Sequence, residues 1–473
     1  MRVLAIDQGT SGTKALVVED GVVVASATQQ VRPQYLADGR VEQDPAELLE
    51  SVLSAGSQAL AQVGSVDAVA LANQGETVLA WDRSTGAPLT TAIVWQDSRA
   101  ADLCAELSPY AARIAERTGL VLDPYFSAPK QAWIRRHLTR EGVVTTTDSW
   151  LLHALSGEFV TDVTTASRSL VLDLDTAQWA PDLLGHFGLG DEELPRVVAC
   201  DEVIGSTSVF GAPVPVVGLM VDQQAALLAQ DCRVVGEAKC TYGTGAFVLG
   251  STGTTPTRSL HGLTASVAAR LRGSTTYCLD GQVFTAGSAL RWLGELGLLS
   301  DPATALAGLD PNSDQSLLFV PALAGLGAPW WKPDAAASFV GLTLATSRAD
   351  VVTAVVRGIL AQIVDLVGVL GADSGAPVDV LRVDGGLTGS AALMQMQTDL
   401  LQAPVQVYPS PDATALGVAA AARIGLESTL SVSDVVGRWT PAATYEPRWS
   451  RERADEYLGN WRAAVTASIG ASP

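Results

Sequence analysis

The chain has 473 residues, with 50 acidic and 30 basic side chains and a formal net charge of −20 at pH 7. This length predicts about two large domains rather than one core, and a hydrophobic content of 48% excludes a disordered chain. The negative charge argues against nucleic acid and anionic membranes as partners. It does not exclude a nucleotide, because backbone N–H groups and Mg²⁺ can hold phosphates locally.

Cysteine and histidine spacing points to no metal site. The five cysteines form no C-x-x-C pair, so reduced thiols are expected, and the four histidines show no zinc-ligand spacing. The N-terminus lacks the pattern of a signal peptide. No uncharged apolar run reaches about 18–20 residues, so no membrane span is expected. The sequence therefore predicts a soluble, cytoplasmic protein and leaves a homo-oligomer open.

The first half begins with short apolar segments that predict strands at residues 3–7, 15–18 and 22–27. Residues 8–14 are expected to form a turn, and Asp20-Gly21 is typical of a hairpin turn. An amphipathic helix is expected at residues 47–62 and a strand at residues 66–72. After a helical middle, a buried strand at residues 216–221 leads directly into Asp222.

The second half partly repeats this order. Strands at residues 238–241 and 246–250 flank the turn 242–245 (YGTG), which indicates an internal duplication at domain scale. The boundary is expected near residues 230–235, which gives domains at 1–231 and 232–473. The later elements expected are a buried helix at 351–370, a strand at 380–383, a turn at 384–386 (DGG), a helix containing Met394 and Met396, a strand at 405–408 and a helix at 412–422.

Residues 7–14 (DQGTSGTK) combine a strand that ends in Asp7 with a turn rich in small residues. Because glycine has no side chain, backbone N–H groups in such a turn can reach phosphate oxygens. Thr10 and Ser11 add hydroxyl donors, Lys14 adds charge, and Asp7 could hold Mg²⁺ through water. Residues 241–245 (TYGTG) would be a second copy of this loop across a cleft. An ordinary hairpin has the same composition, and residues 384–386 also fit a plain tight turn.

Asp222 stands at a strand end and opens a helix. It fits an N-cap, and it also fits a general base that takes a proton from a hydroxyl during phosphoryl transfer. Polar and aromatic residues in the first half suit a polyol, which offers both C–H faces and hydroxyls. Each of them also fits a strand end or a core position: Asn73, Gln74, Glu76, Trp95, Gln96, Asp97, Asp123 and Tyr125.

In this order the segments resemble the FGGY carbohydrate kinase family, and its glycerol kinase branch most closely. The resemblance runs from Asp7 to about residue 425. It rests on residues 7–10 (DQGT), 92–96 (AIVWQ), 123–127 (DPYFS), 165–168 (TASR), 222–225 (DQQA), 241–245 (TYGTG), 325–329 (GLGAP), 382–386 (RVDGG) and 414–417 (TALG).

The resemblance implies an α/β fold of two ribonuclease H-like, actin-like ATPase domains with a catalytic cleft between them. It implies ATP-dependent phosphorylation of a small polyol or sugar, with Mg²⁺, the polyol on the first domain and ATP mostly on the second. Asp222 would be the catalytic base. The polyol would be bound by Glu76, Trp95, Tyr125, Gln223 and Phe247. The nucleotide would be held by Thr10, Ser11, Lys14, Gly243, Thr244, Gly287, Gly386 and Leu387.

Departures from the branch concern mainly the acceptor. Gly75 stands where the branch has an arginine that hydrogen-bonds glycerol, so a clamp is lost and space is expected to open for a four- or five-carbon polyol or ketose. If Arg99 restores the clamp, a plain glycerol kinase is expected instead. Near the nucleotide, Arg291 and Ser390 replace Gln and Asn. Residues 334–338 lack the branch's usual arginine.

Two other protein classes compete with this interpretation. An actin- or chaperone-like nucleotide-gated binding protein shares the phosphate loops, but it gives no reason for Glu76, Trp95 and Tyr125 to accompany Asp222. A Rossmann dehydrogenase is excluded, because no G-x-G-x-x-G follows a strand with an acidic residue about 20 positions later.

Overall fold

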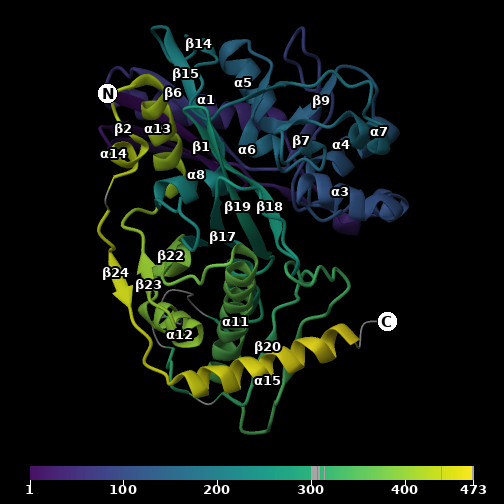
Figure 1. Ribbon diagram of the computed structural model, residues 1–473, viewed down its shortest axis with the longest axis vertical. Coiled ribbons are helices and arrows are strands. Elements are labelled where there is room, and N and C mark those ends of the chain that lie inside the picture. Colours follow the sequence, from purple (N-terminus) through teal and green to yellow (C-terminus); the bar gives the residue numbers. More distant parts are fainter. Residues whose placement is uncertain (300–305, 307–308, 314, 438, 471–473) are drawn as a thin grey trace.

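The computed structural model describes residues 1–299, 306, 309–313, 315–437 and 439–470. Two large sheets, one from each half of the sequence, form its framework (Figure 1). The first sheet has six strands in the order β14 (Gly205–Thr207), β15 (Val214–Val221), β6 (Ala68–Asn73), β1 (Arg2–Gly9), β2 (Gly12–Glu19) and β3 (Val22–Gln30).

The second sheet repeats the arrangement of the first. In the first sheet the β1–β2 hairpin is followed by β6, parallel to β1. In the second, the β16–β17 hairpin is followed by β22, parallel to β16. This correspondence agrees with the predicted duplication. The seven strands, in order, are β18 (Thr264–Leu271), β19 (Ser274–Val283), β17 (Ala246–Gly253), β16 (Ala238–Tyr242), β22 (Leu381–Asp384), β23 (Val405–Val407) and β24 (Ala443–Tyr445).

Smaller sheets and helices complete the fold. A five-stranded sheet beside the first contains β4 (Gln34–Tyr35), β5 (Val41–Gln43), β8 (Ala92–Ile93), β7 (Val78–Trp81) and β9 (Val143–Thr146). The strand pairs are β10 (Val160–Asp162) with β13 (Arg196–Val198), β11 (Leu172–Asp173) with β12 (Gln178–Trp179), and β20 (Leu318–Val320) with β21 (Ser338–Val340). The shorter helices are α2 (Ala101–Glu106), α3 (Ala111–Thr118), α4 (Ser127–His137), α5 (Thr147–Ser156), α6 (Val163–Ala166), α7 (Pro181–Phe187), α9 (Gly287–Glu295), α12 (Ala391–Leu401) and α14 (Val432–Val436).

Helix α1 (Pro45–Ala61) shows how local sequence positions an element. Asp44 caps its N-terminus by accepting a hydrogen bond from the Ala46 N–H, and Pro45 supplies a preset backbone angle at the first position. Apolar residues three or four apart, including Leu48 and Val52, are buried against β2 and β3. The helix covers one face of the first sheet, as the amphipathic pattern predicts.

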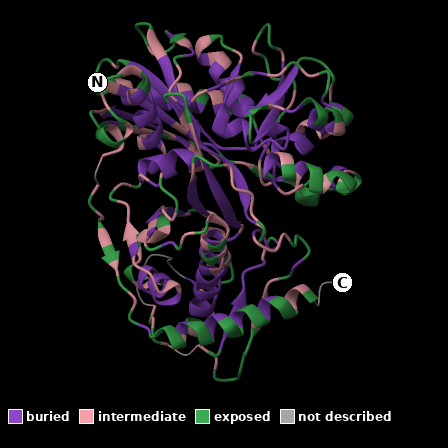
Figure 2. Ribbon diagram, in the orientation of Figure 1, coloured by how far each residue is buried: buried purple, intermediate pink, exposed green. Residues whose placement is uncertain are grey.

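Helix α11 (Arg348–Ser374) is long and apolar enough to cross a membrane, but 83% of its most apolar window is buried inside the protein. It packs against β17, β19 and α12, and Figure 2 shows it mostly buried in the lower part of the molecule. Ser347 and Asp350 form a capping box at its start. The expected buried helix at 351–370 is therefore confirmed.

The chain returns to the first sheet before it ends. Helix α13 (Ala413–Leu426) packs against β1, β6, β15 and α8 (Asp222–Ala229), whereas α15 (Arg451–Gly470) crosses the far end of the second half (Figure 1). One predicted element was too long: the turn at residues 8–14 contains only Thr10 and Ser11. Asp7 and Gln8 pair with Lys14 and Thr13, so the strands continue almost to the tip.

Candidate active site

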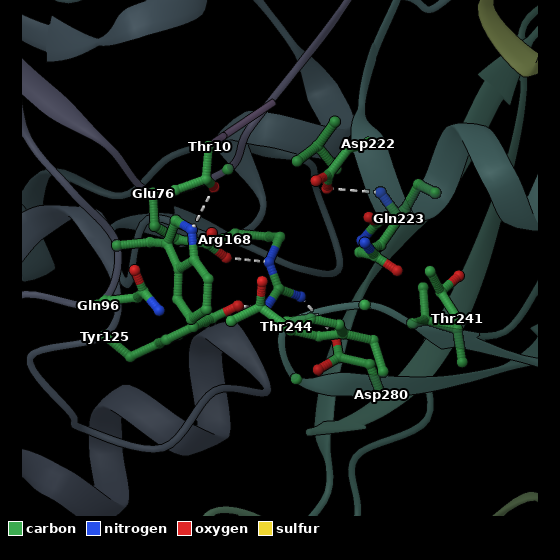
Figure 3. A pocket seen from close by; sticks show the side chains of 18 of the residues that line it. Thr10, Glu76, Gln96, Tyr125, Arg168, Asp222, Gln223, Thr241, Thr244 and Asp280 are labelled. Atoms are coloured by element: carbon green, nitrogen blue, oxygen red, sulfur yellow. Dashed lines mark hydrogen bonds and ion pairs between the residues drawn. The ribbon is translucent and has the colours of Figure 1, made fainter. Parts of the chain in front are cut away.

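A cleft of about 950 Å³, its mouth included, lies where strand ends of the two large sheets meet. Its walls come from the β1–β2 turn, the end of β6, the β15–α8 junction, the β16–β17 turn and β19 (Figure 3). The lining contains twelve of the predicted site residues: Thr10, Ser11, Gly75, Glu76, Trp95, Gln96, Tyr125, Asp222, Gln223, Gly243, Thr244 and Phe247.

Three aromatic rings form one wall of the cleft. Trp95 meets Tyr125 edge-on with ring centroids 5.6 Å apart, and it meets Phe247 of β17 in the same way at 6.0 Å. The Trp95 Nε1–H donates to Thr10 Oγ1 at 2.9 Å. Rings from both halves of the chain therefore give the cleft an apolar surface beside its polar groups.

A buried ion network crosses the cleft next to this wall. Arg168 donates from Nε to Glu76 and from Nη1 to Asp280 Oδ2 at 2.5 Å, and it lies 3.4 Å from the Tyr125 hydroxyl. Burial alone would lower the pKa of Arg168, but Asp280 and Glu76 raise it well above its usual value. Glu76 adopts a left-handed backbone with φ of 58°, which is uncommon for a non-glycine residue.

A buried lysine holds the segment that carries Tyr125. The Lys130 ammonium donates to the carbonyl oxygens of Pro124 at 2.9 Å and Phe126 at 2.7 Å, and to that of Tyr125. Burial lowers the pKa of Lys130 to about 8. These bonds to three consecutive carbonyls fix the position of the aromatic ring in the cleft.

Asp222 is the first residue of α8, and Val221, not Asp222, occupies the N-cap position. The alternative of a plain N-cap aspartate is therefore wrong. The Asp222 Oδ1 accepts a hydrogen bond from the Gln223 N–H at 2.6 Å, and burial raises the pKa of its carboxyl group. Its side chain lines the cleft (Figure 3).

A chain of hydrogen bonds joins the Asp222 region to the second half. Lys239 donates to Gln223 Oε1 at 2.5 Å and to Thr241 Oγ1 at 2.7 Å, and Thr241 donates to Asp384 Oδ1 at 2.5 Å. Lys239 is fully buried, and burial lowers the pKa of its ammonium group. The chain links α8, β16 and the end of β22.

The glycine-rich loops on the second half are packed closely. The Gly287 N–H donates to the Gly243 carbonyl at 3.0 Å, so the start of α9 lies against the β16–β17 turn. Gly385 has φ of 96°, and a Cβ there would lie 2.3 Å from the Tyr242 carbonyl oxygen. By contrast, a Cβ on Gly386 would meet no atom of the non-adjacent described residues within 4 Å. This edge of the turn is open to a ligand.

Asp7 and Lys14 do not line the cleft, but they lie on the strands that lead to it. Lys14 forms an ion pair with Asp412. Burial raises the pKa of Asp7 to about 7, and the negative charge of Asp222 adds to this shift. Among the described residues, no group of three or more His, Cys, Asp or Glu side chains could hold a metal ion by itself.

The other predicted nucleotide residues also lie outside the lining. Arg291 is exposed on α9. Gly386 and Leu387 lie in a short 3-10 helix after β22, and Ser390 caps α12 while it donates to the Leu306 carbonyl at 3.1 Å. Gly386, Leu387 and Ser390 thus lie together between β22 and α12, Arg291 lies on α9, and none of the four is in the cleft lining.

Two expectations about Gly75 need correction. Arg99 cannot supply a clamp from its observed position, because it is bound to Asp97 and Glu42 and does not line the cleft. The space assigned to Gly75 is also partly filled, because a Cβ there would lie only 2.9 Å from Val221 Cγ2. The cation in the lining is instead Arg168.

Several functional candidates were missed by sequence reasoning. Arg168, Lys239, Thr241 and Asp280 all belong to the cleft or its hydrogen-bond network. Arg168 and Thr241 lie in segments that carry the family resemblance, which was a usable signal. Asp280 lies inside a strand without any local motif, so only the fold brings it to the site.

Comparisons with known proteins agree with this geometry. Residues 2–229 match the N-terminal domain of the FGGY family of carbohydrate kinases, and residues 238–426 match its C-terminal domain. A glycerol kinase of Alkalilimnicola ehrlichii is 40% identical, with 99% of this chain and 98% of that protein covered. These matches confirm the predicted family and the predicted ATP-dependent kinase activity.

Solved structures give the same result. A Plasmodium falciparum glycerol kinase with ADP has a TM-score of 0.91 at 30% identity, covering 99% of this chain and 98% of that one. A gluconate kinase from Lactobacillus acidophilus has a TM-score of 0.90 at 20% identity, covering 100% and 99%. The predicted two-domain kinase fold is thereby confirmed, and the chain belongs to the FGGY family of carbohydrate kinases.

Proposed function

We propose that this kinase transfers the γ-phosphoryl group of ATP to a hydroxyl of a small polyol bound in the cleft, with Asp222 as the general base. One observation carries the assignment: the Asp222 carboxylate lies in a single cleft with the aromatic acceptor wall and the two phosphate-loop turns. A base in this position can accept the hydroxyl proton as the oxygen attacks phosphorus and ADP leaves.

Different residues of the cleft bind the acceptor and the phosphate groups. Trp95, Tyr125 and Phe247 cover the C–H faces of the acceptor, while Glu76 and Gln223 orient its hydroxyl groups. Thr10, Ser11, Gly243 and Thr244 bind phosphate oxygens. Because these groups come from both halves, we expect the halves to close on their substrates and exclude water, which limits wasteful hydrolysis.

The residues present fit a Mg²⁺ ion that is held mainly by phosphates and water. Asp7 is a single carboxylate with a pKa raised to about 7 by burial and by Asp222, and Mg²⁺ would relieve that repulsion. Mg²⁺ commonly binds through one or two carboxylates and keeps several waters. When bound, it neutralises charge on the phosphates. Asp7 would hold it through water.

The acceptor substrate we propose is either glycerol or a four- or five-carbon polyol or ketose. Relatives named glycerol kinase favour glycerol, and the methyl group of Val221 over Gly75 limits the space for a longer chain. Gly75 itself supplies no charged donor to the acceptor, which is the feature that favours an acceptor other than glycerol. We expect a soluble, cytoplasmic enzyme.

The test is ADP release by the purified chain with ATP and Mg²⁺, measured with and without three- to six-carbon polyols and ketoses. The proposal predicts strong stimulation by at least one of them. An actin- or chaperone-like protein would hydrolyse ATP at the same rate with every compound, and that result would contradict the proposal.

A further inference from the structure

The acceptor part of the cleft has more negative than positive side chains. Among the described residues that line the cleft, Glu76, Asp222 and Asp280 are carboxylates and Arg168 is the single cation. Burial raises the pKa of both Glu76 and Asp222. Burial is the main cause of both shifts, and nearby cations oppose them: Arg168 and Lys130 beside Glu76, and Lys239 and Arg168 beside Asp222.

Arg168 has little positive charge left to offer a ligand. Its guanidinium is paired with a carboxylate from each side, Glu76 from the first half and Asp280 from β19 of the second. All three side chains are almost completely buried, with 7% or less of each exposed. Two neutralising partners in a poorly solvated site therefore leave this cluster with a net negative charge.

Asp280 is fixed independently of any ligand. The Thr264 hydroxyl donates to its Oδ1, Arg168 donates to its Oδ2, and Ser266 Oγ lies 3.5 Å from Oδ2. The Ser266 hydroxyl is itself held by Gln224 Nε2 at 3.1 Å. Both carboxylate oxygens of Asp280 are already hydrogen-bonded to the protein. We therefore expect the Asp280 side chain to keep its position when an acceptor binds.

This arrangement distinguishes hydroxyl groups from carboxylates. A hydroxyl can donate to the Glu76 or Asp222 carboxylate and also accept from a remaining Arg168 N–H, whereas a carboxylate can only accept. A ligand carboxylate would also face an excess of like charge in a buried site. We propose that Asp280 is a specificity-determining residue, which neutralises Arg168 from across the cleft and restricts the acceptor to uncharged polyols.

This inference rests on the proposed acceptor role of the cleft. The probes are glycerol and glycerate, which differ in one end group, a hydroxymethyl against a carboxylate. The wild-type chain should phosphorylate glycerol and discriminate against glycerate. Asp280→Asn keeps the shape but removes the charge, so the ratio of kcat/KM for glycerate to that for glycerol should rise about tenfold or more, the range of a hydrogen bond to a charged group.

Two control variants separate charge from structure. Asp280→Glu keeps the negative charge and should leave the ratio low. Glu192→Gln removes a carboxylate from a buried pair with Arg135 outside the cleft and should leave both rates unchanged. An Asp280→Asn variant that loses both activities equally, with an unchanged ratio, would overturn the proposal. Similar kcat/KM values for the two compounds in the wild type would overturn it without any variant.

The increase in Tm that each compound produces compares glycerol with glycerate without requiring turnover. The wild-type chain should be stabilised by glycerol more than by glycerate, and Asp280→Asn should reduce that difference. If discrimination is present but no compound stimulates ADP release, the proposed kinase function fails while the role of Asp280 stands. If glycerol stimulates ADP release but the discrimination is absent, only the role of Asp280 fails.

Discussion

The two sides of the cleft are built by different means. The acceptor side consists of buried charged and aromatic side chains, with Arg168 held between Glu76 and Asp280. The phosphate side consists of tight turns rich in glycine: Gly243 and Gly245 line the cleft, and Gly385, outside the lining, lies close to the Tyr242 backbone. On the acceptor side, substitutions that leave buried charges unbalanced should therefore be the most damaging. On the phosphate side, substitutions that add a side chain where there is no space should be the most damaging.

The largest effect is expected from removing the charge at the centre of the acceptor side. Arg168→Met leaves Glu76 and Asp280 buried without their paired cation, and it should lower the free energy of unfolding by about 3–5 kcal/mol. Urea unfolding measures this. The control is Arg136→Met, which breaks an exposed pair with Glu106 and should cost less than about 1 kcal/mol. Equal effects of the two variants would show that the buried network contributes no special stability.

The next effect concerns chemistry rather than stability. Asp222→Asn keeps a similar shape but removes the proton acceptor, so kcat should fall by roughly 10² or more. The measurement is initial ADP release at saturating ATP and polyol, with circular dichroism to verify folding. A folded variant with turnover near that of the wild type would rule out Asp222 as the base.

On the phosphate side, two adjacent glycines should respond differently. Gly385 has φ of 96° and ψ of 171°, a region that glycine alone readily adopts, so Gly385→Ala should cost about 1–3 kcal/mol in unfolding free energy. Gly386→Ala places its methyl group more than 4 Å from every non-adjacent described residue and should leave stability nearly unchanged. If Gly386 borders the nucleotide, its alanine variant should instead raise KM for ATP. The same stability loss in both variants would refute the space argument.

The smallest effect is expected at the acceptor wall. Gly75→Arg restores a charged donor, so it should shift the ratio of kcat/KM values toward glycerol and away from four- and five-carbon acceptors, by about tenfold. Val221→Ala in the same chain should enlarge the shift, because it removes the methyl group that a side chain at Gly75 would meet. Steady-state kinetics with glycerol, erythritol and xylitol measure both ratios. An unchanged ratio in the double variant would show that Gly75 does not set acceptor preference.

The same contrast explains what could be predicted from the sequence. The hairpins and phosphate turns are local features, and glycine and threonine patterns over a few residues predict them. The acceptor side depends on Arg168, which pairs with Glu76 across 92 positions and with Asp280 across 112. No local pattern reports such contacts. The contact between Val221 and Gly75 likewise arises only when β15 packs beside β6.

The length of the first phosphate turn was also misjudged for a physical reason. Small polar residues at 8–14 are typical of a turn, but pairing of β1 with β2 continues to Gly9 and Gly12. Strand pairing within the hairpin therefore overrode the turn propensity of the individual residues. The consequence for the site is a rigid, narrow tip that carries only Thr10 and Ser11 into the cleft.

The most direct test of the central claim is the fate of the γ-phosphoryl group. Phosphorus NMR of a reaction containing ATP, Mg²⁺ and glycerol or erythritol separates phosphorylated polyol from free phosphate. We predict one phosphorylated polyol for each ADP formed by the wild-type chain, and almost none with Asp222→Asn. Release of free phosphate at a rate independent of the polyol would contradict it.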